Sequence, residues 1–81
     1  MKIERHWWNG ISSPRGRRDV YILSDGEHWE VKAQMGGETG RFKIQECPSL
    51  GSANILAGAW RGSGTGWREQ VLTPSAKNTF A

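Results

Sequence analysis

Cys47 and two histidines, His6 and His28, are the side chains in this sequence best suited to nucleophilic or metal chemistry. A catalytic cysteine needs a lowered pKa and an oriented base, and nothing in the spacing brings a histidine to the thiol. A zinc site built from the same three residues would lack a close ligand pair such as C-x-x-C. We therefore expect Cys47 to be a partly buried thiol at a strand end, and we expect neither a metal nor a cofactor.

Two glycine clusters, at residues 36–40 and 62–66, are similar in composition to phosphate-binding loops. Such loops need a Gly-Lys-Ser/Thr sequence that opens a helix, or a strand before and a helix after them in a parallel unit. Neither cluster has that setting, so turn and linker roles are favoured. Glu27 and Glu30 have opposite parity on one predicted strand and cannot act as an acid and base pair. We predict that the protein is not an enzyme.

The elements that position these residues are clearest between residues 19 and 47. Alternating and β-branched patterns predict three antiparallel strands, at residues 20–23, 28–34 and 41–47, with Asp25-Gly26 as the first turn. In the second strand, apolar and polar residues alternate, so Trp29, Val31 and Ala33 face the core and Lys32 faces water. In the third strand, Phe42 and Ile44 are expected on the apolar face and Lys43 and Gln45 on the wet face.

One amphipathic helix is predicted over residues 50–61, because apolar residues recur there at spacings of three and four. Ser49 or Ser52 can cap its first turn, and Gly62 can end it. A sheet with one apolar face needs a cover, which the helix supplies. The predicted fold is α+β, with three or four antiparallel strands and one helix packed across one face.

The two ends of the chain are assigned to separate segments. Residues 1–18 form a basic, partly mobile N-terminal segment, residues 19–72 a single α+β domain, and residues 73–81 a disordered tail. A short extra strand at residues 3–6 and a fourth strand at residues 68–72 are both left open. Of Trp7 and Trp8, at least one is expected to fold onto the core while the other stays exposed.

Size and composition set the class of protein. A chain of 81 residues has room for one small domain, of marginal stability or stabilised as a homodimer. Its single cysteine excludes an intramolecular disulfide, and the sequence contains neither a signal peptide nor a membrane span. We expect a cytoplasmic protein without a membrane partner.

Charge is unevenly distributed along the chain. The net charge of +3 divides into +4 over residues 1–18, −3 over residues 19–48 and +2 over residues 49–81. An acidic sheet is a poor surface for phosphates, which argues against readout of nucleic acid by the sheet itself. The basic arm at residues 15–18 and an exposed tryptophan could still combine phosphate contacts with base stacking.

The order of three strands and a helix, with Trp29-Glu30-Val31 in the hairpin and SANILAGAW in the helix, supports a resemblance. Residues 19–61 resemble the small modules typified by AP2-type and phage-integrase amino-terminal DNA-binding domains, and also short bacterial proteins with a W-x-V hairpin. In those DNA-binding modules, arginine and tryptophan on the outer sheet face make the contacts. The matching positions here hold Glu30 and glutamines as often as bases, so the resemblance assigns no DNA-contacting residue.

Two functions remain open. The first is a small interaction protein that binds an unknown protein, or itself, through a tryptophan-containing surface. The second is a nucleic-acid-binding module that uses the basic N-terminal arm. The candidate contact residues for either partner are aromatic or basic: Trp7, Trp8, Arg15, Arg17, Arg18, Lys32 and Lys43.

Overall fold

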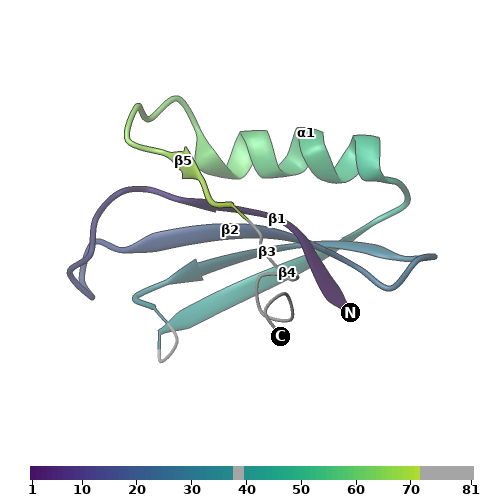
Figure 1. Cartoon of the computed structure of the whole chain (residues 1–81), viewed down its shortest axis with the longest axis horizontal. Helices are drawn as coiled ribbons and strands as arrows, with labels where there is room; N and C mark the ends of the chain where they lie inside the picture. The colour runs from purple at the N-terminus through teal and green to yellow at the C-terminus, as the bar shows by residue number, and fades with distance from the viewer. Residues whose placement is uncertain (38–39, 72–81) are drawn as a thin grey trace, which may run out of the picture.

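One antiparallel sheet carries a helix on one of its faces in the computed structural model, which describes residues 1–37 and 40–71 (Figure 1). The strands follow the order β4-β3-β2-β1-β5 across the sheet. In chain order the elements are β1 (Lys2–Trp8), β2 (Arg18–Ser24), β3 (Trp29–Met35), β4 (Arg41–Cys47), α1 (Leu50–Arg61) and β5 (Arg68–Glu69). The predicted α+β class is confirmed. The predicted tail at residues 73–81 lies outside the described residues.

The described sheet has five strands, so the prediction of three or four strands is wrong in number. β1 pairs with β2, where Trp7 lies opposite Val20, and β5 pairs with the end of β1. The strands left open at residues 3–6 and 68–72 are both present, as Lys2–Trp8 and Arg68–Glu69, and in β1 Trp7 faces the helix while Trp8 faces the opposite side. Residues 2–8 therefore belong to the sheet, although the sequence analysis placed them in a separate N-terminal segment.

The turn between β2 and β3 falls one residue later than predicted: the N–H of Asp25 donates to the carbonyl of His28 at 3.3 Å, so Gly26 and Glu27 are its two central residues. The Asp25 carboxylate accepts hydrogen bonds from the backbone N–H groups of Glu27 and His28, at 2.9 and 2.7 Å. Gly26 has a φ of 97°, a conformation that costs a residue with a Cβ atom considerably more. This turn aligns β2 and β3, so that Ser24 lies opposite Trp29.

The helix begins and ends where the sequence predicts. Ser49 caps α1, since its hydroxyl accepts a hydrogen bond from the N–H of Ser52 at 3.1 Å. Gly62 ends the helix with a φ of 68°, and its N–H donates to carbonyls of the last turn. Arg61 near this end complements the negative pole of the helix.

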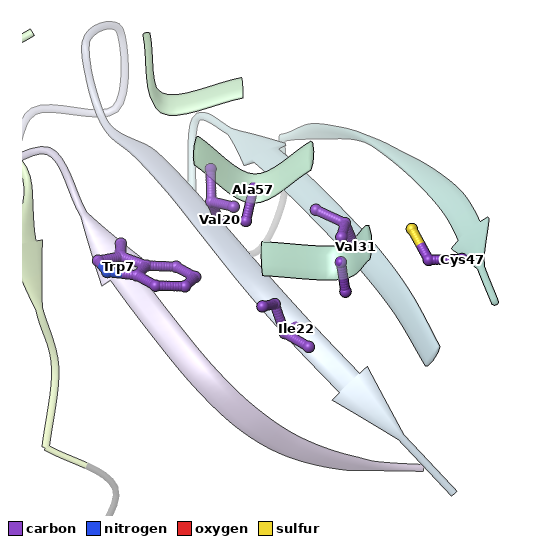
Figure 2. Packing of buried hydrophobic residues seen from close by; sticks show 7 residues of the cluster. Trp7, Val20, Ile22, Val31, Cys47 and Ala57 are labelled. Atoms are coloured by element: carbon purple, nitrogen blue, oxygen red, sulfur yellow. The ribbon is translucent and has the colours of Figure 1, made fainter. Parts of the chain in front are cut away.

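The core lies between α1 and the middle of the sheet (Figure 2). Ala53 and Ala57 are fully buried, and their small side chains allow the helix to approach the strands closely. Figure 2 shows Ala57 against Val20, with Trp7 on the β1 side. The buried apolar residues are Trp7, Val20, Ile22, Val31, Cys47, Ala53 and Ala57.

The faces of β4 are opposite to the prediction. Val31 of β3, which is buried under the helix, lies opposite Gln45, so the odd-numbered residues of β4 face the helix side. Phe42 and Ile44 consequently face the open side of the sheet, with 59% and 48% of their surfaces exposed. β4 is an edge strand that α1 barely reaches, so polar residues on its helix side remain hydrated and the alternation in the sequence does not determine its register.

Candidate functional site

The antiparallel register separates basic from acidic side chains along the strands. Arg18, Met35 and Arg41 form one cross-strand row, at the end of the sheet where α1 finishes and on the left in Figure 1. We call this the basic end. Its cations come from the β1–β2 loop and from the starts of β2 and β4: Arg15, Arg17, Arg18, Arg41 and Lys43.

The opposite end of the sheet, the acidic end, carries most of the carboxylates. Asp25 and Glu27 lie in the β2–β3 turn, and Glu30 lies directly opposite Glu46 in the neighbouring strand. Most of the acids behind the charge of −3 over residues 19–48 lie at this end, whereas the basic end also draws on Arg15, Arg17 and Arg18, which lie outside that range. Opposite charges separated along the sheet leave a local positive potential at the basic end.

A hollow of about 270 Å³ opens on the helix side of the basic end, next to the last turn of α1. Val20 and Ala33 of the sheet contribute apolar walls, and the indoles of Trp60 and Trp67 line it as well. Its basic lining residues come from the starts of β2 and β4, and they are Arg18, Arg41 and Lys43. Such a combination of apolar walls and a few charged groups is typical of ligand-binding pockets.

The cations of the hollow have no acidic partner among the residues that the structure describes. No carboxylate within residues 1–37 and 40–71 forms an ion pair with Arg18, Arg41 or Lys43. The Lys43 ammonium instead lies 4.3 Å from the centroid of the Trp60 ring. Because a cation over an indole is only weakly held at an exposed site, the ammonium is available to an anion.

Asp19, the acid nearest to these cations, is neutralised on the other face of the sheet. Its carboxylate is 2% exposed, accepts hydrogen bonds from Arg17 at 2.9 and 3.1 Å, and lies 2.7 Å from His6 Nε2. Burial raises the pKa of Asp19, but the hydrogen bonds and attraction from Arg17 and His6 outweigh it and the pKa is lowered. Asp19 therefore remains ionised and balances the charge of Arg17.

His6 and Asp19 are a pair that the sequence analysis missed. The His6 ring stacks on Tyr21 with 4.2 Å between ring centroids, and the Arg17 guanidinium lies 5.2 Å from the Trp8 ring centroid. His6 and Asp19 are 13 positions apart in the sequence, so no local pattern indicates the pair. The pairing of β1 with β2 brings the two residues together. The interactions hold this face rigid around a buried ion pair, which is a structural role.

The two adjacent tryptophans have different roles. Trp7 is 4% exposed and lies between the guanidinium groups of Arg5 and Arg61, at 4.6 and 4.1 Å from its ring. Arg5 also donates two hydrogen bonds to Glu69, at 2.7 and 2.8 Å, which lower the pKa of Glu69. The expectation that one indole folds onto the core is confirmed for Trp7, which is thus removed from any binding surface. Trp8 lies half-buried on the open face.

The loop that carries Arg15 is held by hydrogen bonds, although the sequence predicts a mobile segment there. The Asn9 side chain donates to the Gly16 carbonyl at 2.8 Å and accepts from the N–H of Arg18 at 3.1 Å. The N–H of Arg17 donates to the carbonyl of Ser13 at 2.9 Å. These contacts fix the start of β2 and place Arg15 at the basic end, with its side chain exposed.

The two candidate lysines lie on opposite faces. Lys32 is on the open face, where its ammonium lies 4.8 Å from the Phe42 ring and 5.8 Å from the Tyr21 ring. Lys43 is on the helix face, at the hollow. Of the predicted contact residues, the structure therefore gathers Arg18 and Lys43 at the hollow. The sequence did not predict Arg41, which joins them through the pairing of β4 with β3. It also did not predict Trp60, which α1 carries, or Trp67, which follows the turn after α1.

Cys47 is a buried thiol at the end of β4, as expected, and burial raises its pKa. A raised pKa lowers the fraction of reactive thiolate. Within the described ranges, no three histidine, cysteine or acidic side chains gather as metal ligands. In those ranges there is also no helix long and apolar enough to cross a membrane.

Comparisons with known proteins yield no relative. No family model matches the chain, and neither a curated protein nor a solved structure matches it. The resemblance of residues 19–61 to AP2-type and integrase amino-terminal modules therefore stays a prediction, and the functional argument depends on the geometry of the chain itself.

Proposed function

We propose that the protein is a non-enzymatic single-stranded nucleic-acid-binding protein, whose basic end contacts the backbone phosphates. The observation that supports this most directly is a hollow with aromatic walls whose cations form no ion pair with a carboxylate of the described residues: Arg18, Arg41 and Lys43 with Trp60 and Trp67. Phosphate neutralisation supplies most of the affinity of non-specific binding, and aromatic side chains add base stacking.

A single strand fits this surface better than a duplex. Stacking needs unpaired bases, and the aromatic groups at the basic end are half-exposed or, for Phe42, well exposed. The helix of the described residues, α1, lies flat across one face of the sheet (Figure 1). The basic end therefore presents a hollow, and no helix of the described residues protrudes there to enter the major groove of a duplex.

The alternative of an interface centred on tryptophan receives less support. All five tryptophans lie within the described residues, and each is buried or half-buried. Trp7 belongs to the core, and Trp29, Trp60 and Trp67 pack against it. A protein hot spot needs an aromatic anchor that inserts into a pocket of the partner, whereas half-exposed indoles that line a hollow suit a flat base that enters it.

The test is a titration of a fluorescein-labelled single-stranded oligonucleotide with the full chain. Fluorescence anisotropy is measured during the titration, which is repeated at several salt concentrations. Three to four phosphate contacts predict that the logarithm of the association constant falls with the logarithm of salt with a slope of about −2 to −3. Binding that is absent at low salt, or that does not change with salt, would refute the proposal.

One observation favours a second function, a protein interface along β4. Phe42 and Ile44 expose apolar surface on an edge strand whose backbone faces solvent on one side. An exposed edge can pair with a strand of another protein or of a second copy. Ile44→Lys should then abolish any concentration-dependent rise in mass measured by light scattering, while oligonucleotide binding is retained. A protein that stays monomeric at millimolar concentration would remove self-association from consideration.

A further inference from the structure

We propose that the hollow at the basic end holds the terminal nucleotide of a strand, with its base against Trp60 and Trp67 and its phosphate monoester on Arg18, Arg41 and Lys43. This inference rests on the proposed function, because it names the part of the nucleic acid that the site selects. It would distinguish strand ends from strand interiors.

The size of the hollow limits what it can hold. A protein cavity of ~150 Å³ accommodates a benzene ring, and the hollow measures about 270 Å³. One heterocycle of one or two fused rings therefore fits, but a run of stacked bases does not. The rest of the nucleic-acid strand must leave through the mouth of the hollow. Only a base at the end of a strand, or a base turned out of the strand, can meet this condition.

The walls suit the flat face of a base. Trp60 ends the last turn of α1, and Trp67 returns to the hollow after the chain reverses at Gly62. At present the Lys43 ammonium covers the Trp60 ring at 4.3 Å. An incoming base would replace it there, and the flexible lysine stem would carry the ammonium to the phosphate.

The charge at the mouth favours a terminal phosphate. A phosphate monoester carries between one and two negative charges at neutral pH, and the adjoining phosphodiester adds one more. Three cations without carboxylate partners among the described residues match that charge, whereas a simple carboxylate would leave most of it unbalanced. Asp19 also belongs to the lining of the hollow, but its carboxylate is buried and its charge is balanced by the ion pair with Arg17, which weakens its repulsion of the phosphate.

The experiment compares four oligonucleotides of one length with the full chain: complete, with an abasic end, without the terminal phosphate, and with both changes. Each end of the strand is tested in turn. For one of the two ends, the abasic change and the loss of the phosphate should each weaken binding by about tenfold. Equal affinities for all four strands, with binding still salt-dependent, would overturn this inference and leave the proposed function intact.

Ala33→Leu provides the matched variant, because it fills the hollow and removes no charge. Ala33 is half-buried and lies opposite Lys43 on β4, so a larger side chain projects into the hollow. We expect the variant to bind the complete strand no more tightly than the strand with the abasic end, while loss of the terminal phosphate still weakens its binding. Circular dichroism establishes that it is folded, and a folded variant that still prefers the complete strand to the abasic one would contradict the inference. Failure of every strand to bind the wild type would instead refute the proposed function.

Discussion

The basic and acidic ends of the sheet are built from the same strands, yet their charged residues serve different purposes. At the acidic end, the Asp25 carboxylate accepts hydrogen bonds from two backbone N–H groups of the β2–β3 turn. At the basic end, the acid Asp19 is buried and bonded to Arg17 and His6, and Arg18, Arg41 and Lys43 line a hollow. The difference shows that the charge summed along a stretch of sequence is a poor guide to the charge of a surface. In an antiparallel sheet, the start of one strand lies beside the end of the next, so residues far apart in sequence gather at one end of the sheet.

The largest effect is expected from the buried acid of the basic end. Asp19→Ala leaves Arg17 and His6 without their shared carboxylate, and breaking a buried ion pair costs about 3–5 kcal/mol. Urea unfolding should show that loss in the free energy of unfolding. Asp25→Ala at the acidic end is the matched control and should be clearly less destabilising. Equal losses would contradict the distinction between a buried and an exposed acid.

Charge reversal at the basic end should affect binding and leave folding intact. Arg18→Glu combined with Arg41→Glu replaces two attractions to phosphate with two repulsions, and should weaken oligonucleotide binding on the order of 100-fold at moderate salt. Glu27→Lys with Glu46→Lys at the acidic end should leave affinity unchanged or slightly improved. If both double variants altered affinity to the same degree, net charge rather than position would govern binding.

A milder change sharpens the same comparison. Arg41→Ala removes one exposed cation from the mouth of the hollow, and should weaken binding about two- to fivefold, as expected for one exposed charge contact. Lys2→Ala removes one cation from the far end, where Lys2 only approaches Glu4 at 3.8 Å. Anisotropy titrations of the two variants side by side should separate them. Indistinguishable affinities would mean that the cations at the two ends act alike.

The smallest effect concerns acid. Hydrogen bonds from the N–H groups of Glu27 and His28 lower the pKa of Asp25 from 3.8 to about 2. A lowered folded-state pKa means that the contribution of Asp25 to stability is complete above about pH 4 and is lost as pH falls toward 2. The difference in urea midpoint between wild type and Asp25→Asn should therefore shrink between pH 5 and pH 2. A difference that is constant with pH would exclude this contribution.

Local patterns predicted the elements whose neighbours lie close in sequence. The helix at residues 50–61, its Ser49 cap and a β2–β3 turn with Gly26 at positive φ are present, with the turn one residue later than predicted, because capping and turn chemistry act over a few residues. A strand at residues 3–6 was left open, and its full length, Lys2–Trp8, depends on pairing with β2, a contact between segments that local patterns do not determine. The faces of β4 were wrong because its polar residues stay hydrated at the sheet edge on either face.

The candidate site was less predictable than the fold. Arg18 and Lys43 were identified by charge alone, and their gathering with Arg41 depends on strand register, which sequence spacing does not fix. Trp60 joins the site through the packing of α1 on the sheet, and Trp67 joins it through the reversal after α1. Trp7, selected as a contact because of its type, proved to be part of the core.

The most direct test of the account is a two-dimensional amide and indole NMR titration of labelled protein with a single-stranded oligonucleotide. The account predicts shifts confined to the basic end, at residues 15–18 and 41–43, and at the indole N–H signals of Trp60 and Trp67. Signals of Asp25, Glu27 and Glu46 should stay in place, and the shifts should diminish as salt is raised. Shifts centred on the acidic end, or an unperturbed spectrum at low salt, would contradict the claim that the basic end is the binding site.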